Sequence, residues 1–321
     1  MEERKMKTPK FLTVIPLMVL IGAIATGCGE VNSSSTTDKQ ESVNADEVTN
    51  DEVATESAET VEDSLDATAE SDASSSVTVD ETVLVDQDNI KITATALEDG
   101  WFGTDLKLLI ENNSDTSLTV QARNSSVNGY MVDTMMSEEV APGKKANTEL
   151  TFMTSGLKDC GIDTIATMDF SFHIFTTEAW EDYLDTDLIT LTTSAAQTYT
   201  QTYDDSGEIF YDQNGIKIIG KGLSSDESFW GPGLIVYIEN NSSQDFTVQV
   251  RDTSINGFMV DTSMSEEVTV GKKAVSAVTF FSSSLEENGI TDITSIETSF
   301  HVFDTNTWDT IVDTDPIVIN Y

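Results

Sequence analysis

A long internal repeat is the feature of this sequence that most limits how the chain can fold. The stretch VNGYMVDTMMSEEVAPGKKA at 127–146 returns as INGFMVDTSMSEEVTVGKKA at 255–274, with 15 of 20 letters identical at an offset of 128. Two tryptophans, Trp180 and Trp308, keep the same offset. Repeating units of about 110 residues are too long for a solenoid and suit independent domains. The sequence therefore predicts two related domains.

The outer limits of the repeat set the expected domain boundaries. The segment ETVLVDQDNIKI, which begins at residue 81, matches GEIFYDQNGIKI, which begins at residue 207. These matches place the first domain at 81–193 and the second at 207–321. Residues 194–206 between them, rich in Thr, Ser, Gln and Asp, form the expected connector.

Each unit has the residue pattern of β-strands. Apolar and polar residues alternate in stretches such as IKITATAL, and Asn128-Gly129 between two such stretches is a strong hairpin signal. About seven or eight short strands per unit, with frequent turn signals, favour a sandwich. We expect helical turns only at SGLKDCG (155–161) and TEAWEDYLD (177–185), and in the latter Trp180, Tyr183 and Leu184 would share one face. The predicted fold class is all-β.

Two local motifs carry a family resemblance. A turn of the form V-x-P-G-K leads into a strand at 140–144, and an N-N-S strand end precedes it at 112–114. With these motifs, residues 81–321 resemble the immunoglobulin-like sandwich modules of unknown function in Gram-positive surface lipoproteins. Val270 replaces the proline in the second copy, and the Cys-Trp-Cys core of antibody domains is absent. The resemblance implies two tandem immunoglobulin-like β-sandwich domains and implies no catalytic or binding residue.

Residues 1–27 have the layout of a secretory signal peptide. Four basic residues precede an apolar run at 11–24, which is short and contains Pro16, so it is a poor membrane span. The letters ATG before Cys28 are similar to the lipobox of bacterial lipoproteins, which implies cleavage there and a diacylated cysteine. We therefore expect a lipid anchor on the extracellular face of a cell membrane. The alternative is an ordinary cleaved signal peptide with an incidental cysteine.

The segment 28–80 is dominated by Ser, Thr, Glu, Asp, Ala and Val and has no aromatic residue. Such a composition cannot bury enough apolar surface to offset the entropy of ordering, so we expect a disordered acidic tether. The whole chain has a net charge of −41. A surface this acidic repels phosphate backbones, which argues against nucleic acid as a partner, whereas cations and basic surfaces are permitted.

Cysteine and histidine are too sparse for most catalytic sites. Cys160 is the only cysteine besides Cys28, and Asn288 replaces it in the second copy, so we expect neither a disulfide nor a reactive thiol. The two histidines, His173 and His301, occupy matching positions. We interpret them as hydrogen-bonded structural residues and predict no cofactor.

A repeated Asp-Thr-Asp motif raises the question of calcium. Asp185 and Asp187 match Asp313 and Asp315, and paired carboxylates could begin a calcium site. No glycine-bearing loop or bidentate glutamate follows at a recognised spacing. The simpler interpretation is a solvated turn, with the first aspartate of each pair capping the short helix, and we predict no metal site.

Adjacent aromatic residues point to ligand binding. The pairs Trp101-Phe102 and Phe229-Trp230 lie in the least constant loop of the repeat, next to glycines. Two neighbouring side chains in an extended backbone cannot both point inward, so one ring is expected to be exposed, as in sugar-binding sandwiches. The alternative is that one ring covers the core and the other packs at the domain junction.

The methionines after the repeated hairpin are a second candidate surface. Met135, Met136 and Met264 are large and flexible, and such side chains suit adaptable partner surfaces. The alternative role is packing in the core and at strand edges. Together these observations predict a non-catalytic binding or adhesion module for an extracellular protein or glycan; the more specific alternative is binding of carbohydrate or cell-wall glycan through the loop aromatics.

Overall fold

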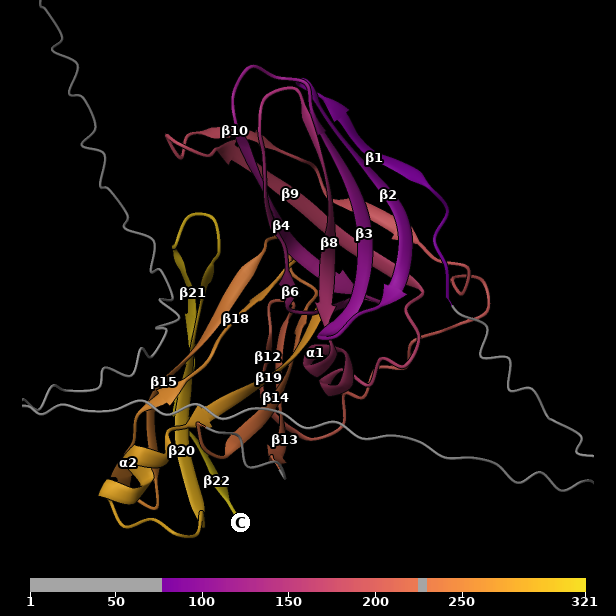
Figure 1. Cartoon of the computed structure of the whole chain (residues 1–321). Coiled ribbons are helices and arrows are strands. Elements are labelled where there is room, and N and C mark those ends of the chain that lie inside the picture. The colour runs from indigo at the N-terminus through magenta and orange to yellow at the C-terminus, as the bar shows by residue number, and fades with distance from the viewer. Residues whose placement is uncertain (1–76, 225–229) are drawn as a thin grey trace, which may run out of the picture. The chain divides into compact units, whose positions relative to one another are not determined.

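The computed structural model describes residues 77–224 and 230–321. The predicted signal peptide, Cys28, nearly all of the predicted tether and Phe229 lie outside these residues. The described chain is all-β, as predicted, and its strands follow one another in the same order in the two copies of the repeat (Figure 1). Neither of its short helices has the length and apolar character that a membrane span requires.

The first copy runs from β1 to β11. Its elements are β1 (Thr82–Gln87), β2 (Ile90–Asp99), β3 (Gly103–Asn112), β4 (Leu118–Val127), β5 (Tyr130–Met131), β6 (Thr134–Met135), β7 (Ser137–Val140), β8 (Lys144–Met153), α1 (Thr154–Asp159), β9 (Thr167–Thr176), β10 (Asp182–Asp185) and β11 (Ile189–Thr192).

The second copy runs from β12 to β22. Its elements are β12 (Glu208–Gln213), β13 (Ile216–Leu223), β14 (Gly233–Asn240), β15 (Phe246–Ile255), β16 (Phe258–Met259), β17 (Thr262–Ser263), β18 (Ser265–Val268), β19 (Lys273–Phe280), α2 (Ser282–Glu287), β20 (Ser295–Asp304), β21 (Thr310–Asp313) and β22 (Ile317–Asn320).

Each copy is a β-sandwich. In the first, the sheet β1-β2-β3-β8-β6 faces the sheet built on β4 and β9, and Figure 1 shows these layers crossing. Side chains from both layers, such as Leu108, Phe152, Val120 and Phe172, are fully or almost fully buried in one core. Alternation along the strands accounts for this arrangement, because every second side chain points to the same face. The second copy repeats it around its own core.

The recurring N-N-S strand end has a structural explanation. Asn112 is fully buried, and its Nδ2 donates to the carbonyl oxygens of Val140 (2.7 Å) and Thr116 (2.9 Å). Its Oδ1 accepts from the backbone N–H of Ser114 at 2.9 Å. Asn240 makes the same set of bonds in the second copy. The side chain thus satisfies backbone groups near the ends of β3 and β7, which belong to different sheets, and replacing it would orphan them.

The structure confirms two of the three local elements that the sequence predicted. The two-residue turn at Asn128-Gly129 is confirmed, with φ of 50° and 86° between paired residues Val127 and Tyr130. The helix predicted near 155–161 is confirmed as α1. The helix predicted at 177–185 is wrong, because this segment forms a turn and then strand β10, which pairs with β9.

Candidate binding sites

All four tryptophans of the chain lie on its surface. The exposed fractions are 93% for Trp101, 65% for Trp180, 64% for Trp230 and 72% for Trp308. Tryptophan is on average a strongly buried residue, and exposed tryptophans are typical of binding surfaces. The four rings therefore define the candidate sites.

Trp101 and Trp230 occupy the predicted loops between the second and third strands of each copy. Phe102 is also exposed, at 59%, so in the first copy the alternative, in which one ring covers the core, is wrong. The loops are tied to the start of the short helices: Thr154 N donates to Phe102 O, and Ser282 N donates to Trp230 O, both at 2.9 Å. These bonds hold the aromatic residues at a fixed corner of each sandwich.

A second pair of exposed rings forms what we call the aromatic stacks. In the first copy, the rings of Phe175 and Trp180 are 5.2 Å apart and 16° from parallel, and His173 lies 5.4 Å from Phe175. In the second copy, Phe303 and Trp308 are 5.3 Å apart and 14° from parallel, with His301 at 5.3 Å. The phenylalanines are buried, whereas the tryptophans at the end of each stack are exposed.

The backbone of each stacking tryptophan is in an unusual conformation. Trp180 has φ of 58° and Trp308 has φ of 64°, in the left-handed region that bulky residues seldom adopt. A backbone bond from the tryptophan N–H to Thr176 O (2.8 Å) or Asp304 O (2.9 Å) closes each turn. Such conformations cost of order 1 kcal/mol and concentrate at functional sites. The same cost is present in both copies.

The histidines and the Asp-Thr-Asp motifs support these turns. His173 Nδ1 lies 2.6 Å from Asp185 Oδ1, and His301 Nδ1 lies 2.6 Å from Asp313 Oδ1, as expected for structural histidines. Because no helix forms here, the predicted capping role of the two aspartates is wrong. The threonine hydroxyl of each motif accepts a hydrogen bond from a backbone N–H of the neighbouring strand instead. Phe172 N donates to Thr186, and Phe300 N donates to Thr314. Among the described residues, no group of three potential ligands is arranged for a metal ion.

The methionines do not form one surface. Met135 is half exposed, Met136 packs against the first core, and Met264 is buried in the second core. Packing therefore accounts for Met136 and Met264, and of these three candidates only Met135 is exposed to a partner.

The repeated motif instead joins the two copies. Lys273 N donates to Gly129 O at 3.0 Å, which pairs β19 with β5. Lys272 Nζ lies 2.6 Å from Asp169 Oδ2, and both side chains are largely buried. Burial alone would raise the pKa of Asp169, but hydrogen bonds from Lys272 and Thr190 lower it overall. The hairpin of the first copy thus meets the Gly-Lys-Lys turn of the second; we call this contact the junction.

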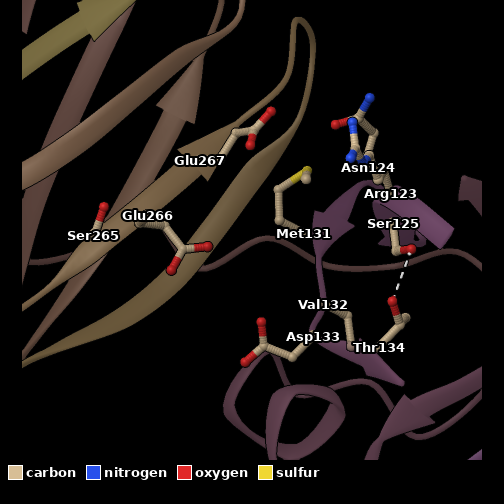
Figure 2. A pocket seen from close by; sticks show the side chains of 10 residues that line it. All are labelled: Arg123, Asn124, Ser125, Met131, Val132, Asp133, Thr134, Ser265, Glu266 and Glu267. Atoms are coloured by element: carbon tan, nitrogen blue, oxygen red, sulfur yellow. Dashed lines mark hydrogen bonds between the residues drawn. The ribbon is translucent and has the colours of Figure 1, made fainter. Parts of the chain in front are cut away.

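A cleft of about 320 Å³ lies beside the junction, lined by residues of both copies (Figure 2). Glu266 lies in it, and burial raises its pKa to about 7, with the charges of Asp133 and Glu267 adding to the effect. Burial also raises the pKa of the nearby Cys160 thiol to about 12, which keeps it protonated and unreactive. Burial of Glu266 therefore makes the charge in the cleft depend on pH.

Sequence reasoning missed Trp180, Trp308 and Glu266 as site residues. The two tryptophans gave a signal, because they recur at the same offset within acid-rich segments that lack Lys and Arg. Glu266 gave none, because Glu138 has the same sequence neighbours in the first copy.

No known protein family matches the chain, and no curated protein matches it. The crystal structure of YadV chaperone is similar at a TM-score of 0.22 and 10% sequence identity, covering 73% of this chain and 100% of that chain.

Proposed function

We propose that this protein is a non-catalytic binding or adhesion module displayed on the extracellular face of a cell membrane. Two tandem immunoglobulin-like domains, 81–193 and 207–321, would present the binding surface. The observation that carries the proposal is the exposure of all four tryptophans. A partner that covers the exposed part of an indole removes apolar surface from water and so gains binding energy.

Anchoring by a lipid on Cys28 is the second part of the proposal. The basic start, the apolar run and the small residues before Cys28 support it, and 28–80 would hold the domains away from the lipid surface. Cys28→Ser should move the protein from the membrane fraction to the medium, as followed by immunoblotting. Retention of the variant in the membrane fraction would contradict the anchor.

The more specific alternative is glycan binding through the loop aromatics. Trp101 and Trp230 are exposed at matching corners of the two copies, and the flat face of an indole packs well on the apolar face of a sugar ring. We expect the double variant Trp101→Ala/Trp230→Ala to lose binding to cell-wall glycan, measured by co-sedimentation. If the variant sediments like the wild type, glycan binding through these rings is wrong.

A further inference from the structure

Both aromatic stacks lie beside the outermost strand of a sheet. The turn that contains Trp180 leads directly into β10, and the turn that contains Trp308 leads into β21. Within the described part of the chain, β10 pairs only with β9 and β21 only with β20, so each ends its row of strands. A terminal strand offers backbone N–H and C=O groups to an incoming extended chain.

Each stacking tryptophan has one covered face and one open face. Phe175 lies parallel to one face of Trp180, and Phe303 lies parallel to one face of Trp308. The exposed fractions of 65% and 72% require that the opposite faces are open to solvent. The face of an indole carries negative potential and attracts ammonium and guanidinium groups more strongly than other aromatic rings do.

The residues around each ring determine which ligand charge is favoured. Segment 176–187 contains five carboxylates and segment 304–315 contains four, and neither contains Lys or Arg. The carboxylates belong to Glu178, Glu181, Asp182, Asp185 and Asp187 in the first copy, and to Asp304, Asp309, Asp313 and Asp315 in the second. Across residues 77–224 and 230–321, the ion pairs of these groups are with His173 and His301 only. Their negative charge is thus not neutralised by any Lys or Arg in that part of the chain.

The same charges select against a second copy of the chain as the occupant. Two acidic edge strands placed side by side repel each other, which is a common protection against edge-to-edge pairing. A basic extended segment would instead pair its backbone with the open strand edge, and its cationic side chains would contact the electron-rich ring and the carboxylates.

We propose that each copy binds an extended polypeptide segment rich in Lys or Arg along β10 or β21. The backbone of the segment extends the sheet, one cationic side chain lies over Trp180 or Trp308, and its neighbours pair with the carboxylates. This inference rests on the proposed binding function and specifies its ligand class. It uses a different pair of tryptophans from those of the glycan alternative.

The test uses the full chain and a synthetic peptide of alternating Lys and Thr, with binding followed by calorimetry. We expect two peptides per chain and an affinity that falls steeply with added salt. Trp180→Ala/Trp308→Ala should weaken binding about tenfold. The matched control Trp101→Ala/Trp230→Ala should bind like the wild type, and circular dichroism should show both variants folded.

A second variant tests the charges without changing the rings. Glu181→Gln/Asp182→Asn/Asp309→Asn should weaken peptide binding and reduce its salt dependence.

The inference is overturned if an alternating Glu and Thr peptide binds as tightly as the Lys peptide, or if Trp180→Ala/Trp308→Ala has no effect. It is also overturned if neutral glycan binds through Trp101 and Trp230 while the Lys peptide does not bind, and the proposed function then survives. If no tryptophan variant changes binding to intact cells, the proposed function itself fails.

Discussion

At the scale of single residues, the repeat places identical side chains in different surroundings. Glu138 and Glu266 match in sequence, but only Glu266 lines the cleft at the junction. Its pKa is raised by burial from the ordinary 4.5 to about 7. The folded state therefore favours the neutral acid, whose contribution to stability is complete below pH 4.5 and is lost as the pH rises through 7.

Glu266→Gln should remove that pH dependence. At pH 8 the variant should be about 1–2 kcal/mol more stable than the wild type, a value reduced for partial solvent exposure. Thermal unfolding followed by circular dichroism from pH 5 to pH 8 measures the change. Glu138→Gln is the control and should keep the wild-type pH profile; an unchanged profile in Glu266→Gln would contradict the assignment.

At the scale of elements, sequence patterns predicted the turns and strands that depend on neighbouring residues alone. The Asn128-Gly129 turn was predictable because both residues accept positive φ, and alternation predicted most strands. The segment 177–185 was predicted wrongly, because three apolar residues at helical spacing also fit a turn followed by a strand. Pairing of β10 with β9 decided between these forms, and that contact is not local. The same non-local contact creates the aromatic stacks.

The two hairpin glycines provide a prediction at this scale. Gly129 and Gly257 have φ of 86° and 83°, so an alanine at either position is strained. A Cβ on Gly129 would lie 2.9 Å from the hydroxyl oxygen of Tyr203, whereas a Cβ on Gly257 would meet nothing within 4 Å. We expect Gly129→Ala to destabilise the protein by about 1 kcal/mol more than Gly257→Ala, as measured by urea unfolding. Equal losses would mean that the hairpin of the first copy is not packed at the junction.

At the scale of the whole molecule, duplication produced an asymmetric pair. Tyr130 is almost fully buried in the hairpin of the first copy, whereas its counterpart Phe258 is half exposed. The sheet face that receives the first hairpin contains the buried Ile219 and Tyr237, which pack with the first core. Thr93 and Leu109 hold these positions in the first copy. The shared motif could not reveal this difference, because the residues that direct the docking lie outside it.

The junction should make the two copies unfold together. Lys272 and Asp169 form a largely buried ion pair across it, and removal of one partner leaves an uncompensated charge. Lys272→Ala should therefore cost about 3 kcal/mol and divide one calorimetric transition into two, since each copy keeps its own core. Lys144→Ala, the exposed counterpart, should change stability by less than about 0.5 kcal/mol and keep a single transition. Two transitions already present in the wild type would show that the copies fold independently, and the pH dependence expected of Glu266 would then be confined to the transition of the second copy.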